Sequence, residues 1–217
     1  MNALINGESI LEYLLKNRKP YSQLEKEMEE YAKERQIPIL DYKSAELLEL
    51  LIELKQPETA LEIGTAIAYS SIKIAKRMLP NGKLDTIEKS KDNLPLALKY
   101  INNSGLNGKI NVIFGDAIEI LANSDKTYDF IFLDADKQDY EKLFNLSLPL
   151  LNNNGIIFID NLLWKGYVAE NIEDVPKSYK TSTEQVTLFN KLFLNNKYLE
   201  SQIFPIGDGI GVGIKRT

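Results

Sequence analysis

The sequence predicts an α/β fold built on a seven-stranded, mostly parallel sheet. From about residue 59 onward, short apolar runs alternate with helix-length amphipathic segments, which is typical of βαβ units with helices on both faces of the sheet. The last two apolar runs are separated only by the glycine-rich segment 205–209. This segment is too short for a helix, so the two runs predict a C-terminal antiparallel hairpin.

Helical periodicity dominates the chain before this sheet. A first helix is expected after Ser9, a candidate N-cap, and two more are expected over 21–35 and 44–54. No linker-like segment separates these extra N-terminal helices from the strands, so we expect a single domain with a Rossmann-like core. The boundaries are 1–217 for the domain, 1–56 for the helical extension and 57–217 for the core.

The core elements follow from the same patterns. The first five apolar runs show little polar alternation, as expected for strands that are covered on both faces. The predicted strands are 60–63, 83–88, 110–114, 130–134, 156–160, 199–204 and 210–214. The helices expected between them are 69–78, 91–103, 117–123, 138–149 and 183–194.

The composition excludes several kinds of chemistry. The 217 residues contain no cysteine and no histidine, which removes disulfides, thiolate zinc sites and imidazole acid–base catalysis. A general base must therefore be Lys, Asp, Glu or Tyr. The net charge of −5 weighs against non-specific nucleic-acid binding. No apolar run of membrane-spanning length and no signal-peptide pattern occurs, so we expect a cytoplasmic protein without membrane contact.

Acidic residues end two of the apolar strands. Asp134 closes the run that begins at Ile131, and Asp160 closes the run 155–160 and is followed by Asn161. Ligands of open parallel sheets bind at the carboxyl ends of the strands. Mg²⁺ and similar hard cations prefer carboxylate and carbonyl oxygens. The pattern predicts a divalent-cation site beside a cofactor pocket, although either aspartate could instead cap a helix.

The turn after the first strand predicts the cofactor. Gly64 allows a tight turn, and Glu88 ends the next strand at the distance where an acidic residue often binds ribose hydroxyls. Ala66 and Ala68 stand where a GxGxxG motif would have glycines, which favours a cofactor without phosphates, such as S-adenosylmethionine. Taken singly, Gly64 could be plain turn geometry and Glu88 a helix-capping charge.

These residues resemble the cation-dependent class I O-methyltransferases, the family of catechol and caffeoyl-CoA O-methyltransferases. The resemblance runs over residues 5–215, and its Asp-Ala-Asp-Lys and Asp-Asn-x-Leu-Trp combination is highly specific. Within the family, the chain looks most similar to bacterial tRNA 5-hydroxyuridine methyltransferases. The matching segments are 62–65, 86–88, 132–140, 160–166 and 207–209.

The resemblance implies a role for particular residues. Lys137 matches the catalytic lysine, and Ala68 departs from the glycine that is usual in the first turn. A methyl group there would lie near the cofactor, and a positive φ at Ala68 would cost strain. The implied cation ligands are Asp134, Asp160 and Asn161, and the implied cofactor contacts are Leu40, Glu62, Gly64, Ser70, Glu88, Ala117 and Asp134.

The expected acceptor pocket lies beside the cation. Lys137 is expected one helical turn from Asp134, facing the same pocket, where its pKa would be lowered. Trp164 and Tyr167 are expected to wall the pocket, although Trp164 could be ordinary core packing and Lys137 an exposed helix residue. Asp136 and Asp139 are expected to be solvated or capping.

Three functions remain open from the sequence. The favoured one is methylation of 5-hydroxyuridine in the tRNA anticodon, and the alternative is methylation of a small catechol or hydroxycinnamoyl-type molecule. The third is a non-catalytic protein that binds S-adenosylmethionine. The family also implies a homodimer, in which the N-terminal helices would take part. For tRNA, the expected phosphate contacts are Lys16, Arg18, Lys19, Lys165, Lys177 and Lys180.

Overall fold

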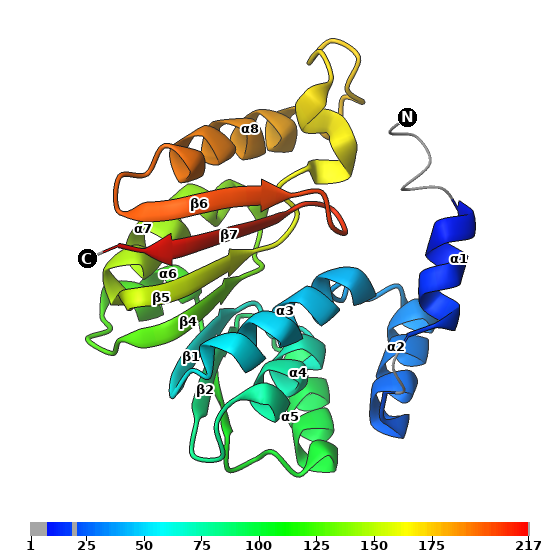
Figure 1. Ribbon diagram of the computed structural model, residues 1–217, viewed down its shortest axis with the longest axis vertical. Helices are drawn as coiled ribbons and strands as arrows, with labels where there is room; N and C mark the ends of the chain where they lie inside the picture. Colours follow the sequence, from blue (N-terminus) through cyan, green and yellow to red (C-terminus); the bar gives the residue numbers. More distant parts are fainter. Residues whose placement is uncertain (1–7, 19–20, 217) are drawn as a thin grey trace.

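The computed structural model, which describes residues 8–18 and 21–216, contains one seven-stranded sheet (Figure 1). The strand order is β3-β2-β1-β4-β5-β7-β6, with parallel pairing from β3 to β5 and antiparallel pairing of β7 with both β5 and β6. The predicted α/β class and the hairpin are confirmed. The strands are β1 (Thr59–Ile63), β2 (Lys83–Glu88), β3 (Ile110–Phe114), β4 (Tyr128–Leu133), β5 (Leu151–Ile159), β6 (Leu199–Phe204) and β7 (Ile210–Lys215).

Helices cover both faces of this sheet (Figure 1). On one side lie α2 (Gln23–Arg35), α3 (Tyr42–Lys55), α4 (Tyr69–Arg77) and α5 (Asn93–Ser104), whereas α1 (Glu8–Lys16) is drawn at the edge of the molecule, away from the sheet. On the other lie α6 (Ala117–Ala122), α7 (Tyr140–Leu150) and α8 (Lys180–Leu194), and two short 3-10 segments, η2 (Lys137–Asp139) and η3 (Trp164–Ala169), occur in the loops.

The side chains of β4 point alternately to the two faces of the sheet, which explains why there is an apolar core on each face. Phe130 and Phe132 belong to the apolar core beneath α3, α4 and α5, whereas Ile131 and Leu133 belong to the core beneath α7 and α8. All four side chains are fully buried. Because successive side chains of a strand point to opposite faces, one apolar strand supplies both cores.

Three details differ from the sequence predictions. Ser9 lies inside α1, which begins at Glu8, so it is not the N-cap. β5 begins five residues earlier than expected, since Leu151 pairs with Tyr128 of β4 and the pairing resumes at Ile156 after a register shift. Asn154, within the shifted segment, has a positive φ. The asparagine-rich composition of that segment resembles a loop, but its backbone pairs as a bulged strand. α7 begins at Tyr140, after a 3-10 turn.

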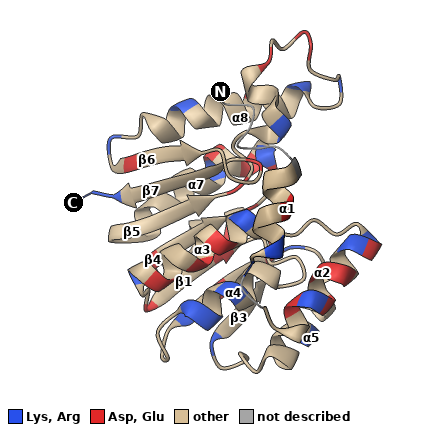
Figure 2. Cartoon of the chain, turned by 45° about the vertical axis from the view of Figure 1, so that its right-hand side comes forward, with Lys and Arg blue, Asp and Glu red and all other residues tan. Residues whose placement is uncertain are grey.

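Buried charge holds the N-terminal helices against the core. The ammonium group of Lys73 on α4 is 2% exposed and lies 3.1 Å from Glu25 of α2 and 3.2 Å from Glu49 of α3. Glu25 also accepts hydrogen bonds from the backbone and hydroxyl of Ser22 in a capping box. The colours of Figure 2 show that acidic and basic residues are mixed along these helices. Helices α2 and α3 are therefore tied to α4 by ion pairs as well as by apolar packing.

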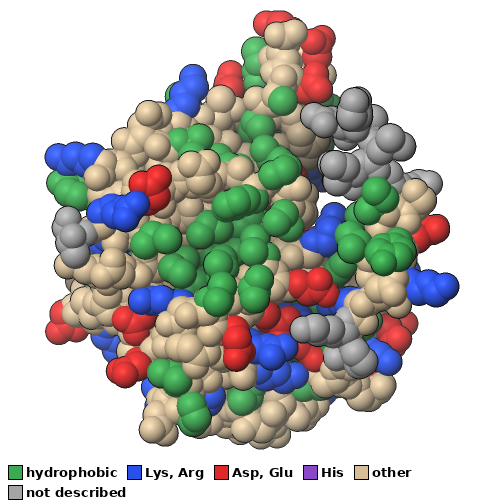
Figure 3. All heavy atoms as spheres, viewed as in Figure 1, with side chains coloured by type: hydrophobic (Ala, Val, Ile, Leu, Met, Phe, Trp, Pro, Cys, Tyr) green, Lys and Arg blue, Asp and Glu red, His purple; other side chains and the backbone are tan. Residues whose placement is uncertain are grey.

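Apolar side chains gather in the middle of the face drawn in Figure 3, with charged side chains around them. The large apolar side chains that are exposed include Leu50 and Leu54 of α3 and Phe204 and Ile214 of the hairpin. Among the described helices, none combines the length and apolar character needed to cross a membrane.

Replacing Glu25 by glutamine should destabilise the protein. The amide keeps the shape of the capping box but leaves the buried Lys73 with Glu49 alone, so we expect a loss of about 2 kcal/mol in the free energy of unfolding, measured by urea denaturation. Glu53→Gln is the control, because Glu53 is 58% exposed and 3.9 Å from Arg77. Its expected cost is under about 0.5 kcal/mol. Equal effects of the two variants would contradict the role given to Glu25.

The stabilisation from Glu25 should also depend on pH. Burial alone would raise the pKa of Glu25, but the hydrogen bonds from Ser22 and the charge of Lys73 outweigh it and lower the pKa from 4.5 to about 2. A lowered pKa in the folded state means that the stabilisation is complete above pH 4.5 and is lost as the pH falls toward 2. The difference in unfolding free energy between wild type and Glu25→Gln should therefore shrink over this window. A constant difference would contradict this assignment.

Candidate active site

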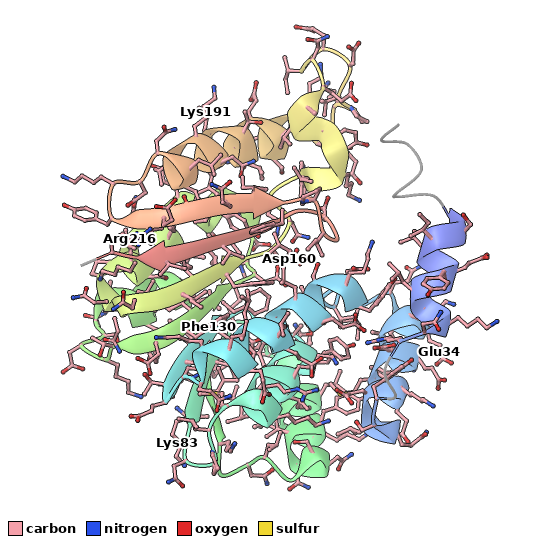
Figure 4. The ribbon with its side chains drawn as sticks, in the orientation of Figure 1. Glu34, Lys83, Phe130, Asp160, Lys191 and Arg216 are labelled. Atoms are coloured by element: carbon pink, nitrogen blue, oxygen red, sulfur yellow. The ribbon has the colours of Figure 1, made fainter. Side chains whose placement is uncertain are left out.

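A cavity of about 930 Å³ opens at the carboxyl ends of β1 to β5. This is the edge where parallel α/β sheets place their ligand sites. Figure 4 labels Asp160, which directly follows β5 at this edge. Of the residues expected at the site, those lining the cavity are Gly64, Glu88, Ala117, Asp134, Lys137, Asn161 and Trp164.

The first turn approaches β4 so closely that only glycine fits. Gly64 has φ +107°, and a Cβ atom there would stand 1.9 Å from the carbonyl oxygen of Asp134. Asp134 in turn donates its backbone N–H to Ile63, the last residue of β1. Gly64 therefore fixes the floor of the cavity and the position of Asp134 together.

Hydrogen bonds from two backbone N–H groups hold Glu88 at the cavity. It is 5% exposed, and its two oxygens accept hydrogen bonds from the backbone N–H of Ala66 at 2.7 Å and of Ser90 at 2.6 Å. Each carboxylate oxygen has a further lone pair, and Glu88 lines the cavity. The residues thus fit a ligand that presents hydroxyl donors, as the ribose of S-adenosylmethionine does.

The two alanines of the first turn occupy different places. Both have positive φ, 47° at Ala66 and 67° at Ala68, so the strain expected at Ala68 is present. The methyl group of Ala68, however, is fully buried in the core and does not line the cavity, whereas Ala66 does. The expectation that the Ala68 methyl lies near the cofactor is wrong, because the chain turns it under the first helix of the core.

Three of the expected cofactor contacts lie outside the cavity lining. Leu40 is buried in the core, and Ser70 is buried at the start of α4. Glu62 is fully buried and accepts hydrogen bonds from the hydroxyl groups of Ser71 and Thr86. Burial raises the pKa of Glu62 to about 7 against the effect of these bonds. Glu62 supports the first turn from beneath rather than facing the cavity.

The expected cation ligands converge around a lysine. The Lys137 ammonium group donates to the side-chain oxygen of Asn161 at 2.6 Å and lies 3.8 Å from a carboxylate oxygen of Asp134. Asp160, which is 5% exposed, accepts a hydrogen bond from the backbone N–H of Asn161. Neither Asp134 nor Asp160 caps a helix. The alternative that Asp134 or Asp160 serves as a helix cap is therefore excluded.

The element that carries Lys137 differs from the one expected. Asp134 and Lys137 are not on one helix, since 134–136 form a loop and Lys137 begins the 3-10 turn η2. The ammonium group also donates to the hydroxyl of Tyr140 at 2.6 Å, and that hydroxyl donates to the carbonyl of Asp160. The side chain is 10% exposed, so it is not a solvated helix lysine.

The electrostatics of this group suit a divalent cation. Burial, together with the nearby charge of Asp134, raises the pKa of Asp160 to about 7. Burial also lowers the pKa of Lys137, although the carboxylates act in the opposite direction. Among the described residues, no cluster of three or more Asp, Glu, Cys or His side chains forms a metal site. The set here has two carboxylates and one amide, which are oxygen donors that Mg²⁺ accepts.

Aromatic rings lie next to this group, since the Lys137 nitrogen is 5.7 Å from the centroid of the Trp164 ring. Trp164 lines it, and its ring packs edge-on against Tyr179 at 6.2 Å between centroids. Tyr167 lies 5.3 Å from Tyr179 but does not line the cavity, so it supports the wall from behind. The indole N–H of Trp164 is buried without a hydrogen-bond partner among the described groups. Trp164 is thus pocket wall rather than core.

Two acidic residues of the cavity lining make contacts that the sequence did not predict. Asp136 is exposed, as predicted, but its carboxylate pairs with Lys89 across the cavity rim. Asp208, in the turn between β6 and β7, also lines the cavity, and its carboxylate accepts the backbone N–H of Lys165. The sequence assigned no role to Asp208, although the Gly-Asp-Gly sequence around it was among the motifs of the resemblance.

The expected phosphate-binding side chains do not form one free basic patch. Arg18 is 8% exposed, pairs with Glu29 and Glu46, and stacks on Tyr21, and these contacts compete with the phosphate contact expected for it. Lys180 pairs with Glu173, and Lys19 lies outside the described residues. Lys16, Lys165 and Lys177 are exposed.

The sheet order and the site define a class I, S-adenosylmethionine-dependent methyltransferase. Comparison with known families places it further: the O-methyltransferase family profile matches residues 18–216, and the chain belongs to that family. The chain is an S-adenosylmethionine-dependent O-methyltransferase of the caffeoyl-CoA O-methyltransferase type.

Individual relatives agree with this assignment. The chain is 33% identical to a caffeoyl-CoA O-methyltransferase of Populus kitakamiensis over 75% of its length and 72% of the relative. It is 29% identical to caffeoyl-CoA O-methyltransferase 1 of Arabidopsis thaliana over 97% and 85%. The fold matches an O-methyltransferase of Bacillus cereus, solved with S-adenosylhomocysteine, with a TM-score of 0.83, 23% identity, and coverage of 96% and 97%.

Removing the Glu88 carboxylate should weaken cofactor binding. Glu88→Ala deletes the acceptor for ribose hydroxyls and releases the N–H groups of Ala66 and Ser90, so the Kd for S-adenosylhomocysteine should rise about tenfold or more by calorimetry. Glu119→Ala, at an exposed position of α6, should leave it unchanged. Unchanged affinity in a folded Glu88→Ala protein would show that the cofactor binds elsewhere.

Proposed function

We propose that this enzyme methylates one hydroxyl of a small planar acceptor that carries two vicinal oxygens, as catechols and hydroxycinnamoyl-type molecules do, with the help of a divalent cation. The convergence of Asp134, Asn161 and Lys137 beside the ring of Trp164, whose centroid is 5.7 Å from the Lys137 nitrogen, carries the proposal. When bound, the sulfonium cofactor supplies the methyl group and the cation lowers the pKa of the acceptor hydroxyl.

The residues of the chain would share the remaining work. Asp134, Asp160 and Asn161 would hold the cation, and the lowered pKa of Lys137 suits it to accept the proton of the hydroxyl. The hydroxyl of Tyr140 and the amide of Asn161 fix the position of the Lys137 nitrogen. Trp164 offers a face on which a planar acceptor can lie. A protein that only binds the cofactor would not need this combination.

The second candidate acceptor is 5-hydroxyuridine in tRNA, which has the same pair of adjacent oxygens. Lys165 and Lys177 are exposed on the segment that follows Asn161, which favours it. Two observations weigh against it. Arg18 is taken up by ion pairs, and the cavity lining carries the additional acidic side chains Asp116, Asp136, Asp139 and Asp208. The small acceptor therefore fits better.

The test is methyl transfer from labelled S-adenosylmethionine, with Mg²⁺ or with EDTA. The acceptors are a simple catechol, caffeoyl-CoA and bulk tRNA that lacks the native modification. We expect Mg²⁺-dependent label in a small acceptor. Label in tRNA alone, with a steep loss of activity as salt rises, would overturn the small-acceptor proposal and establish the tRNA one.

The cation site has its own prediction. Asp160→Ala should lower Mg²⁺-dependent turnover at least about 100-fold, because it removes a cation ligand, while the protein keeps its fold and its affinity for the cofactor. Asp125→Ala, in an exposed loop, is the matched control. Full turnover in a folded Asp160→Ala enzyme, or equal rates with EDTA, would refute a cation at this place.

The homodimer that the family implies also stays a prediction, which sedimentation equilibrium would test.

A further inference from the structure

The segment after Asn161 has an unusual backbone. Trp164, Lys165 and Gly166 are three consecutive residues with positive φ, at 45°, 59° and 85°. For a bulky side chain such as tryptophan, this conformation is a genuine outlier that persists only where neighbouring contacts impose it. We call residues 162–166 the strap. The strap contains Trp164, whose ring lines the cavity. Its geometry requires an external support.

The turn between β6 and β7 provides that support. Leu162 donates its backbone N–H to the carbonyl of Gly209 at 2.9 Å, and Leu163 donates to the carbonyl of Asp208 at 2.8 Å. Lys165 donates its N–H to a side-chain oxygen of Asp208. Of these contacts, only the last comes from a side chain. It is also the one that lies inside the left-handed part of the strap.

The glycines beside Asp208 allow the turn to come this close. A Cβ atom at Gly209 would stand 2.4 Å from Leu163, and one at Gly207 would stand 2.2 Å from the hydroxyl oxygen of Ser44 in α3. The turn is thus wedged between the strap on one side and the start of α3 on the other. The backbone on both sides of Asp208 is fixed by this packing. The position of Asp208 therefore does not depend on its bond to Lys165, and its carboxylate can hold the strap in place.

We propose that Asp208 is a positioning residue that fixes the indole of Trp164 as the wall of the acceptor pocket, and thereby sets affinity for the acceptor but not for the cofactor. This inference rests on the proposed function, since it assumes that the acceptor lies against Trp164. The Asp208 carboxylate also lines the cavity, and its second oxygen accepts no hydrogen bond from the described residues. The carboxylate therefore faces the acceptor as well as the strap.

The test separates this proposal from the proposed function, because Trp164 is the only tryptophan of the chain. Its fluorescence reports the strap without any acceptor. In Asp208→Ala, the emission should shift to longer wavelength and acrylamide should quench it more strongly. Asp208→Asn keeps an oxygen that can accept the Lys165 N–H, so its fluorescence should stay close to wild type. Asp139→Ala, a cavity carboxylate without a bond to the strap, is the control.

Kinetics supply the second readout. With whichever acceptor the enzyme methylates, Asp208→Ala should raise the acceptor KM about tenfold and leave the Kd for S-adenosylhomocysteine unchanged. Unchanged fluorescence in Asp208→Ala would overturn the positioning role even if no acceptor has been found. Changed fluorescence with an unchanged acceptor KM would overturn the link to the acceptor pocket. If Asp208→Ala does not fold, Asp208→Leu, which fills a similar space but has no oxygen to accept the Lys165 N–H, gives the same fluorescence comparison.

Discussion

The site depends on one buried ammonium group. Lys137 is surrounded by oxygens from three parts of the chain: the loop after β4, the end of β5 and the start of α7. Without a positive charge there, Asp134 and Asp160 would repel each other in a poorly solvated place, which is costly. A single lysine only partly balances two carboxylates and the neighbouring Asp208. That imbalance is the physical reason for proposing a divalent cation beside it.

The parallel sheet supplies the geometry for this cluster. Asp134 is bonded through its backbone to Ile63, and Asp160 is bonded through its backbone to Leu133. The ladder that holds the strands together thus also sets the spacing of the acidic side chains. Gly64 belongs to the same arrangement, because any side chain there would displace the carbonyl of Asp134. The turn at Gly64 and the proposed cation site are therefore not independent, and a change in either is expected to disturb the other.

The acceptor side is built differently. Its wall is a short strap with left-handed backbone, supported by a hairpin turn from the C-terminal part of the chain and by Tyr179. Loops of this kind can change their side chains while the sheet stays the same, so acceptor choice can vary within one fold. The cofactor side, by contrast, is fixed by strand ends and by a glycine that no other residue can replace.

The sequence by itself determined the strand and helix order, the hairpin, and the places of Asp134, Asp160 and Glu88, because these follow from local periodicity and from the rule that parallel strands end at one edge. It placed Lys137 in the right pocket but on the wrong element, and it did not predict that the Ala68 side chain is buried in the core, since a 3-10 turn and a buried turn depend on packing. Nor could it reveal the ion pairs of Arg18 or the contact of Asp208 with Lys165. Those partners are far apart in the chain, and only the tertiary structure brings them together.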